Sequence, residues 1–361
     1  MEENIIVTDN ADMQQFPGLL LHWNQVQNKR QMPWKGEQDP YRIWLSEIIL
    51  QQTRVEQGLK YYERFIKDLP TIRDLAAAPE QQVFKLWEGL GYYSRCRNLI
   101  ATAKDIVQNM DGRFPTSYEG VLALKGVGPY TAAAITSFAY NAPYAVLDGN
   151  VFRVLARIFN IAQPVDSAGG KKLFSALAQR ILPVEQAGIY NQALMDFGAT
   201  ICKPLPECAR CFFNQHCKAF LLNKQAALPV KEKKAGVRHR WFHYFVLEQE
   251  DHIAIGQRTA KDIWQGLYEL ILIESDRQLQ KEEALQHLEK SFGIKKGTYV
   301  VVSAAASTTQ RLTHQLICFS FIHLELEKKD TLPHYQWISK KHLHQFAFPK
   351  TISQFLAKNL V

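Results

Sequence analysis

Four of the six cysteines in this chain lie within 16 residues, and they are the side chains whose spacing most clearly implies chemistry. They are Cys202, Cys208, Cys211 and Cys217, in the pattern C-x5-C-x2-C-x5-C. Four thiolates can hold either a Zn²⁺ ion or a [4Fe–4S] cluster. Structural zinc sites usually contain two separate C-x-x-C pairs, whereas this stretch contains one. The spacing therefore favours an iron–sulfur cluster.

A glycine-containing turn forms the second motif, within LKGVGPYTAAA at residues 124–134. Gly126, Val127 and Gly128 would join two helices, so that backbone N–H groups could approach a phosphate at a helix N-terminus. Such a turn alone would predict only a connection between helices. Asp148 follows 20 residues after Gly128, in LDGNVFRV, and places a carboxylate within the same region.

Composition bounds the class of protein. A chain of 361 residues has a natural length for two domains. Its content of 47% hydrophobic and 22% charged residues is typical of a soluble protein with a core. No apolar run reaches the roughly 18 residues that a membrane span needs. The acidic, polar N-terminus predicts no signal peptide, so we expect a reducing compartment and cysteines that bind metal. The net charge of +8 suits a polyanionic partner, although many basic proteins bind no nucleic acid.

The elements that must position these groups change in character along the chain. Apolar spacing predicts an all-α domain at 1–225, and a charged stretch without periodicity predicts a linker at 226–239. Alternating aromatic and β-branched residues then predict an α+β domain at 240–361. Helices are expected at 41–50, 83–90, 119–124, 131–140, 151–159, 277–292 and 350–359. Strands are expected at 241–248, 252–258, 267–273, 298–304 and 315–326.

Residues 41–217 resemble the helix–hairpin–helix DNA glycosylases of the endonuclease III-like iron–sulfur branch, and most of all the adenine DNA glycosylases of the MutY type. The matching stretches are WLSEIILQQTRV at 44–55, WEGLGYYSR at 87–95, LKGVGPYTA at 124–132, LDGNVFRV at 147–154 and MDFGATIC at 195–202, with the cysteine loop. The resemblance implies removal of adenine mispaired with 8-oxoguanine or guanine in duplex DNA, a [4Fe–4S] cluster and a Nudix-like C-terminal domain.

Cleavage of an adenine N-glycosidic bond needs a proton on the leaving base and a carboxylate beside the sugar cation. Glu47 stands in an apolar run, and burial there would raise its pKa and keep a proton available. The resemblance makes Glu47 the acid at adenine N7 and Asp148 the carboxylate that supports the cation. Glu47 could instead be a solvated helix residue. Asp148 could be a helix N-cap, a role that is compatible with catalysis.

Tyr130 bears on the type of glycosylase. Bifunctional relatives resembling endonuclease III have a lysine at this point of the motif, which attacks the sugar as a Schiff base. A phenol cannot form that imine, so the sequence predicts a monofunctional enzyme. By resemblance, Tyr130 and Asn150 would orient Asp148 and the catalytic water. Tyr130 could also be a packing aromatic residue.

The resemblance also implies residues that contact DNA. A base inside a duplex must be flipped out before its glycosidic bond can be reached. The predicted strand-separating loop consists of Gln51, Gln52, Thr53 and Arg54, with Gln52 entering the stack. Of the paired tyrosines, Tyr93 is predicted to act as the wedge and Tyr92 to pack in the core.

The C-terminal domain resembles a Nudix-like domain that recognises 8-oxoguanine, without a Nudix pyrophosphatase signature after Gly266. Its predicted reader is Leu312-Thr313-His314, although an ordinary turn before the following strand fits equally well. The chain departs from the family pattern in two places. The first gap between cysteines is five residues rather than six, and Lys35 replaces a common arginine near the adenine pocket.

Two alternatives remain open at this stage. One is an endonuclease III-like glycosylase for oxidised pyrimidines, which Tyr130 and the second domain disfavour. The other is a non-catalytic iron–sulfur protein that binds DNA or senses redox state. We expect a monomer with no membrane association, in the cytoplasm of a bacterium and associated with its nucleoid.

Overall fold

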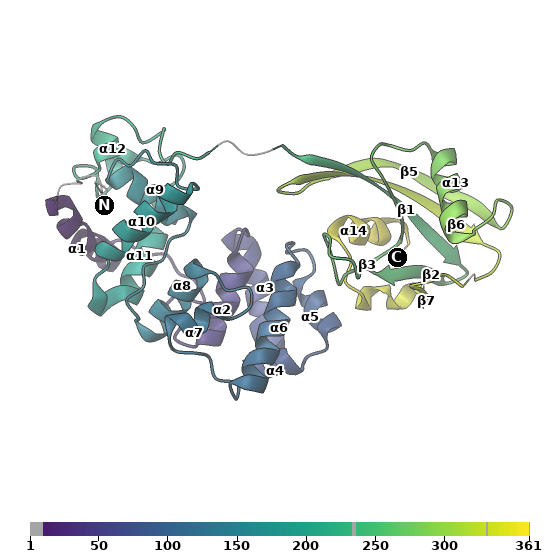
Figure 1. Ribbon diagram of the computed structural model, residues 1–361, viewed down its shortest axis with the longest axis horizontal. Coiled ribbons are helices and arrows are strands. Elements are labelled where there is room, and N and C mark those ends of the chain that lie inside the picture. The colour runs from purple at the N-terminus through teal and green to yellow at the C-terminus, as the bar shows by residue number, and fades with distance from the viewer. Residues whose placement is uncertain (1–9, 233–235, 330, 361) are drawn as a thin grey trace. The chain divides into compact units, whose positions relative to one another are not determined.

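The computed structural model describes residues 10–232, 236–329 and 331–360, and the chain divides into two compact units (Figure 1). The helical unit comprises Met1–Ala77 and Asn98–Lys233, and the sheet unit comprises Ala78–Arg97 and Lys234–Val361. The sheet unit thus includes a segment from within the predicted helical domain. Residues 1–9 of the polar N-terminus and 233–235 of the predicted linker lie outside the described residues.

Helices make up most of the chain before the linker. They are α1 (Asn10–Val26), α2 (Pro40–Leu50), α3 (Val55–Asp68), α4 (Ile72–Ala77), α5 (Glu80–Trp87), α6 (Ser94–Asn109), α7 (Tyr118–Leu122), α8 (Pro129–Tyr140), α9 (Gly149–Ile158), α10 (Ala168–Arg180), α11 (Ala187–Thr200) and α12 (Lys218–Leu221). Short 3₁₀ turns occur at Val184–Gln186 and Cys208–Arg210.

Polar residues determine where several of these helices begin. The side chain of Asp39 accepts a hydrogen bond from the backbone N–H of Tyr41 at the start of α2. Ser117 caps α7 and Ser167 caps α10 in the same way. Asp148 caps α9 by accepting from the N–H of Val151. Such caps satisfy N–H groups that have no partner within the helix.

The predicted helix–hairpin–helix is formed by α7 and α8. Gly126 lies in the turn at a φ of 81°, where an L side chain is strained. A Cβ atom on Gly126 would also lie 2.7 Å from the side chain of Asn98 on α6. Glycine is therefore required here by both backbone conformation and packing.

The sheet unit contains one sheet, to which seven strands of the described residues contribute. The strands are β1 (Arg238–Gln249), β2 (His252–Gln257), β3 (Tyr268–Glu269), β4 (Ile271–Ser275), β5 (Tyr299–Arg311), β6 (Gln315–Leu326) and β7 (Tyr335–Ser339). Their order is β3-β2-β1-β6-β5, with β4 pairing β1 and β7 pairing β2. β1 and β6 pair in parallel and the remaining pairs are antiparallel.

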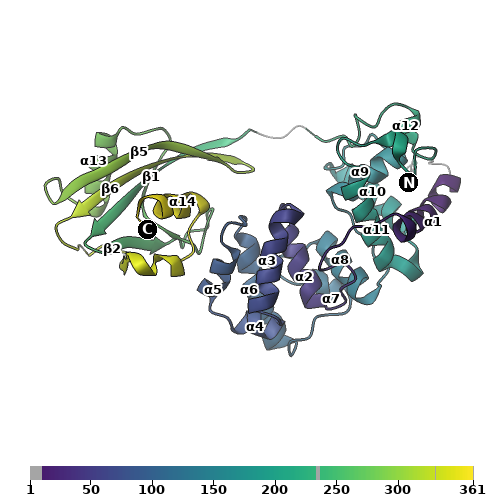
Figure 2. The same cartoon turned by 180° about the vertical axis from the view of Figure 1, so that it is seen from behind.

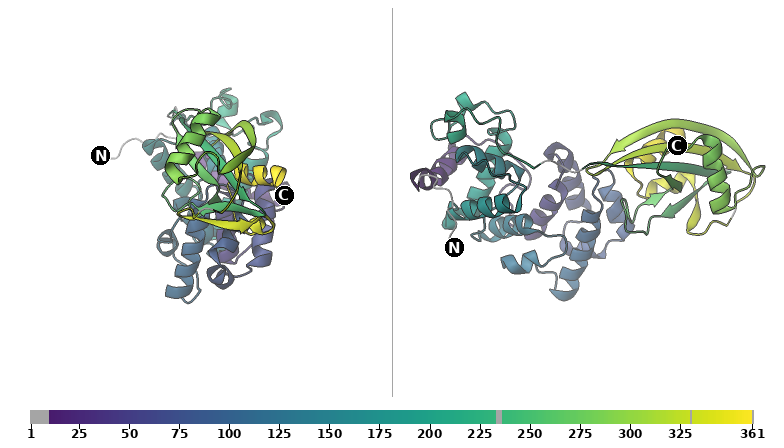
Figure 3. Two further views of the ribbon diagram at one scale, coloured as in Figure 1. Left: turned by 90° about the vertical axis from the view of Figure 1, so that its right-hand side faces the viewer. Right: turned by 45° about the horizontal axis from the view of Figure 1, so that its top comes forward.

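The two faces of this sheet are covered by different helices, α13 (Lys281–Phe292) and α14 (Lys350–Asn359), as Figures 2 and 3 show. Side chains of successive strand residues point to opposite faces. Ile322 of β6 accordingly packs in the core with Leu288 of α13. Phe321, the preceding residue, stacks on Phe355 of α14 with ring centroids 4.1 Å apart.

Most predicted elements occur close to their expected positions, but the strand expected at 267–273 is divided into β3 and β4, and the structure adds helices that were not predicted: α1, α3, α4, α6, α10, α11 and α12. The helix expected at 83–90 is α5, which ends at Trp87, since Gly89 and Gly91 then adopt positive φ. β5 continues to Arg311 through residues that lack apolar alternation, and β7 was not predicted. None of the helices that the structure describes is long and apolar enough to cross a membrane.

Candidate active site

The carboxyl group of Glu47 is buried in the helical unit, with only 5% of the residue exposed. Ile43, Trp44 and Ile48 of α2 are buried beside it in sequence, so the helix carries Glu47 into the core. The hydroxyl of Tyr130, on α8, donates a hydrogen bond of 2.6 Å to Oε2 of Glu47. Burial raises the pKa of Glu47 to about 7, the hydrogen bond from Tyr130 opposes that rise, and the charge of Asp148 adds to it. Glu47 can therefore hold and release a proton near neutral pH.

Asp148 is fixed at the N-terminus of α9 by two hydrogen bonds. Its Oδ1 accepts from the N–H of Val151 at 2.7 Å, and its Oδ2 accepts from the amide of Asn150 at 2.8 Å. Burial raises its pKa, while these hydrogen bonds and the charge of Arg153 oppose the rise. The helix-cap role considered from the sequence is thus real. The charge of Asp148 also acts on both Glu47 and Tyr130.

The third predicted residue, Tyr130, is not merely a packing aromatic. Burial and the carboxylates of Glu47 and Asp148 raise its pKa well above the usual value, so the phenol stays protonated and donates. The nearby amide of Gln51 donates to Thr131, the residue after Tyr130, at 3.2 Å. The structure therefore brings α2, α8 and the start of α9 together around two carboxyl groups.

Arg153, which the sequence did not single out, supports Asn150 from one turn further along α9. Its Nη2 donates to Oδ1 of Asn150 and to the carbonyl of Gly198, each at 2.8 Å, and its Nε donates to the carbonyl of Cys202 at 2.7 Å. A Cβ on Gly198 would lie 2.7 Å from the side chain of Asn150. The i, i+3 spacing of Asn150 and Arg153 was the available signal in the sequence.

The four clustered cysteines line one small cavity, whose wall also includes Arg157 of α9. The Arg157 side chain is buried and donates to the carbonyls of Lys203 and Pro204, at 2.7 and 3.0 Å, and to the sulfur of Cys202 at 3.5 Å. Arg157, also missed from the sequence, thus holds the loop and supplies a positive charge that suits a thiolate.

Four cysteine side chains around one cavity form a donor set that fits either a Zn²⁺ ion or an iron–sulfur cluster, since thiolates bind both. In the part of the chain that the structure describes, no group of three or more His, Cys, Asp or Glu side chains is already arranged to hold a metal ion.

Of the predicted DNA-contacting loop, Gln52 and Arg54 are exposed between α2 and α3, and Gln52 has a φ of 57°. Thr53 and Gln51 are partly buried there. In the hairpin, Gly126 is exposed and Gly128 partly so. The side chain of Val127 is buried, and its N–H bonds to the carbonyl of Leu124 at 3.1 Å. Val127 therefore anchors the turn.

The structure buries Tyr93 and exposes Tyr92, the opposite of the burial that the predicted roles imply. Tyr93 is only 5% exposed, and its hydroxyl accepts a hydrogen bond from the N–H of Gly89 at 3.1 Å. Tyr92 is 46% exposed and has a φ of 48°. A side chain that enters a base stack must project from the surface, so Tyr92 fits the wedge role and Tyr93 does not.

Lys35, whose role as a DNA contact stays a prediction, makes contacts within the helical unit. Its Nζ forms an ion pair of 2.9 Å with Asp196 and donates to the carbonyl of Arg30 at 3.0 Å. Asp196, on α11, is fully buried, and it also accepts from Arg30 at 2.8 Å and from Asn28 at 2.9 Å. The ammonium group of Lys35 is thus engaged within the protein, where it fastens the segment that leads into α2.

A cavity of about 520 Å³ lies in the sheet unit, between the turn after α5 and the β5–β6 hairpin. Tyr92, Thr313 and His314 are among its lining residues. The hydroxyls of Tyr92 and Thr313 lie 2.5 Å apart. The residues predicted to recognise 8-oxoguanine, Thr313 and His314, therefore line the same cavity as the exposed Tyr92.

Comparison with known families agrees with this arrangement. Residues 45–178 match the family model of the HhH-GPD superfamily of base excision DNA repair proteins, and residues 243–358 match that of the NUDIX domain. A solved thermostable thymine-DNA glycosylase is similar at a TM-score of 0.55 and 28% identity, covering 59% of this chain and 98% of that one. Fold and site thus define a base excision repair glycosylase with a second, NUDIX-type domain.

Curated relatives narrow the class. An adenine DNA glycosylase of Buchnera aphidicola subsp. Baizongia pistaciae is 37% identical over 255 residues, which are 70% of this chain and 72% of the relative. The adenine DNA glycosylase of Homo sapiens is 30% identical over 401 residues, covering 94% of this chain and 73% of the relative. The chain belongs to the adenine DNA glycosylase family. The predicted family, α+β fold class and enzyme class are confirmed.

Proposed function

We propose that this enzyme removes adenine paired with 8-oxoguanine or guanine in duplex DNA by hydrolysis, and leaves an abasic site. The relatives named above are adenine DNA glycosylases, which supports adenine as the base. The observation that carries the proposal is the buried Glu47 carboxyl, hydrogen-bonded to Tyr130 and influenced by the charge of Asp148.

The proposed chemistry uses the two carboxyl groups differently. Glu47 is the general acid and protonates N7 of the flipped adenine, because its raised pKa keeps a proton available near neutrality. Asp148, held by Asn150 and by the start of α9, stabilises the positive charge that develops on the sugar. Water then completes the hydrolysis.

The enzyme is proposed to be monofunctional. Strand cleavage by a Schiff base needs an amine at the position of Tyr130. Tyr130 instead donates a hydrogen bond to Glu47, and thereby positions the acid.

Cys202, Cys208, Cys211 and Cys217 are proposed to hold a [4Fe–4S] cluster. When bound, such a cluster would order the loop that follows α11. Arg157 holds the backbone of this loop, and Arg153 connects it to Asn150.

The DNA contacts in the proposal come from exposed residues of both units. Gln52 and Tyr92 would occupy the stack, Gly126 and Gly128 would approach a phosphate, and Thr313 and His314 would read the lesion base. The enzyme is further proposed to act as a monomer in the bacterial cytoplasm, at the nucleoid.

The test is single-turnover excision on a labelled duplex with one 8-oxoguanine·adenine pair, beside a guanine·adenine duplex and a thymine glycol duplex. The proposal expects strand breaks at adenine only after alkaline treatment. Glu47→Gln should abolish excision and retain duplex binding, and Asp148→Asn is the matched variant for the second carboxyl. Cleavage of the thymine glycol duplex without alkali would contradict the proposal. Iron and sulfide content of the purified enzyme tests the cluster separately.

A further inference from the structure

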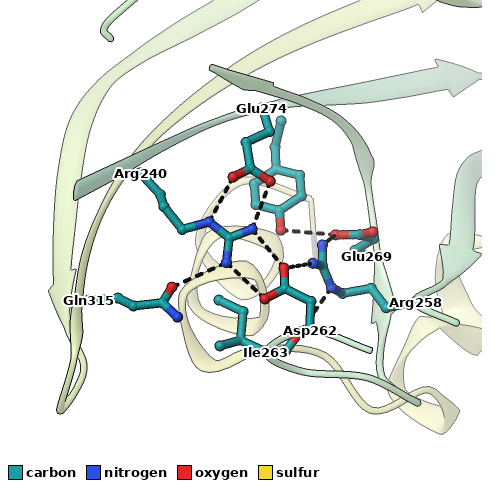
Figure 4. Close-up of polar contacts among 8 residues, drawn as sticks. Arg240, Arg258, Asp262, Ile263, Glu269, Glu274 and Gln315 are labelled. Atoms are coloured by element: carbon teal, nitrogen blue, oxygen red, sulfur yellow. Dashed lines mark hydrogen bonds and ion pairs between the residues drawn. The ribbon is translucent and has the colours of Figure 1, made fainter. Parts of the chain in front are cut away.

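An ionic network with two buried arginines connects to the start of β6 in the sheet unit (Figure 4). We call it the Arg240 network. It contains two arginines, three carboxylates and one amide, from four strands and the loop between β2 and β3. Its members are Arg240, Arg258, Asp262, Glu269, Glu274 and Gln315.

Arg240, on β1, is at the centre of the network, with 6% of its side chain exposed. Its guanidinium makes two hydrogen bonds to Glu274, both at 2.7 Å, and two to Asp262, at 2.9 and 2.6 Å. The remaining bond goes to the side-chain oxygen of Gln315 at 3.1 Å. These bonds use all five N–H groups of a guanidinium, so its orientation is fully determined.

Asp262 is in turn held from its other side. Arg258 donates to it at 3.1 Å and also pairs with Glu269, which accepts from Tyr244 at 3.1 Å. Burial would lower the pKa of Arg240, but the hydrogen bonds and charges of Glu274 and Asp262 raise it, so the centre stays charged. Asp262 and Gln315 both line the cavity that contains Thr313.

Gln315 connects this network to the hairpin, since it is the first residue of β6 and follows His314 directly. Its backbone carbonyl accepts from the N–H of Leu312 at 2.8 Å, and the carbonyl of His314 accepts from the N–H of Arg238 at 3.0 Å. Thr313 therefore sits on a short turn whose β6 side is fixed by both main chain and side chain.

An ionic network around buried arginines contributes little net stability, because desolvation of the charges offsets much of their attraction. The network instead holds its side chains, including that of Gln315, in a single arrangement. 8-Oxoguanine differs from guanine at one edge, by the O8 atom and the N7–H group. A site can distinguish them by hydrogen bonds only if its own groups are held in place.

We propose that Gln315, held by Arg240, is a positioning residue that fixes the Leu312–His314 turn and so determines how strongly 8-oxoguanine is preferred over guanine opposite adenine. This inference rests on the proposed function. Glu47 and Asp148 belong to the helical unit, so a change at Gln315 leaves the bond-breaking groups unaltered.

The test compares Gln315→Leu, which keeps the size but loses the acceptor, with Gln315→Glu, which keeps the acceptor. Gln336→Leu is the matched control, because Gln336 is an exposed glutamine elsewhere in the same sheet. Each variant is assayed by single-turnover excision on 8-oxoguanine·adenine and guanine·adenine duplexes, together with its melting temperature. Should Gln315→Leu fail to fold, Gln315→Asn removes the same contact by shortening the side chain.

Gln315→Leu is expected to lower the ratio of the excision rate on the 8-oxoguanine·adenine duplex to that on the guanine·adenine duplex about tenfold, which is the effect of one hydrogen bond. Only the rate on the 8-oxoguanine·adenine duplex should fall. Gln315→Glu and Gln336→Leu should keep the wild-type ratio. An unchanged ratio in Gln315→Leu, or an equal loss on both duplexes, would overturn the inference. Equal rates on the two duplexes for the wild-type enzyme would instead contradict the proposed recognition of the lesion base by Thr313 and His314, and would overturn this inference with it.

Discussion

The hydrogen bond from Tyr130 to Glu47 makes a quantitative prediction about pH dependence. In the proposed mechanism Glu47 acts in its protonated form, so excision should slow as pH rises through its pKa of about 7. Tyr130 stabilises the ionised carboxylate through a bond of 2.6 Å, and its replacement by phenylalanine removes that stabilisation. Glu47 in Tyr130→Phe should therefore keep its proton to higher pH.

The size of the shift follows from the strength of the bond. A hydrogen bond to a charged group is worth about 1.5 to 3 kcal/mol. One pK unit corresponds to about 1.4 kcal/mol. In Tyr130→Phe, the alkaline limb of the plot of excision rate against pH should therefore move to higher pH by about one to two units.

The assay is single-turnover excision from about pH 5 to 9. Tyr190→Phe is the matched control, because in the described part of the chain the buried hydroxyl of Tyr190 has no hydrogen-bond partner. The alkaline limb of the pH–rate profile of Tyr190→Phe should stay at the wild-type position. A Tyr130→Phe limb that stays in place or moves to lower pH would refute the assignment of Glu47 as the acid placed by Tyr130.

Three further predictions concern stability. At pH values above 7, Glu47→Gln should raise the melting temperature, with a stabilisation on the order of 3 kcal/mol, because the variant no longer buries an ionised carboxylate. The gain should vanish below about pH 4.5, where Glu47 is protonated in both the folded and the unfolded state. Equal gains at both pH values in thermal unfolding would contradict the raised pKa. Gly266→Ala should cost about 1 to 3 kcal/mol in denaturant unfolding, since Gly266 has a φ of 91° and its added Cβ would lie 2.8 Å from the ring of Phe84; a neutral effect would show that the turn can shift. Asp196→Asn should destabilise by about 3 kcal/mol, because it removes a buried carboxylate from two cationic partners, and a melting temperature like that of the wild type would refute that role.

The local features of the site could be read from the sequence. An acid within an apolar run, an aspartate before a helix and closely spaced cysteines are all properties of short segments. The structure places Glu47, Tyr130, Asp148 and Asn150 together, as the motifs suggested. The assignment of a role to each one remains a prediction.

The supporting residues could not be predicted, because their partners are far away in the sequence. Asp196 meets Lys35 across 161 positions, and the side chain of Arg157 bonds to carbonyls of the loop beyond α11. The burial of Tyr93 rather than Tyr92 could not be predicted for a different reason. Neighbouring residues in a turn with positive φ have no periodicity that tells which one is buried.

The composition of the sheet unit has a consequence for how the chain is made. Residues 78–97 leave the ribosome early, yet their packing partners, such as the backbone of Phe346 and Phe348 that bonds to Lys85 and Glu88, are made near the end. Residues 98–233 are synthesised in between, a delay on the order of ten seconds at 5–20 residues per second. The nascent helical unit must therefore fold before the residues that pack against α5 have been synthesised. A chain interrupted before residue 234 would expose the buried side of α5 to water.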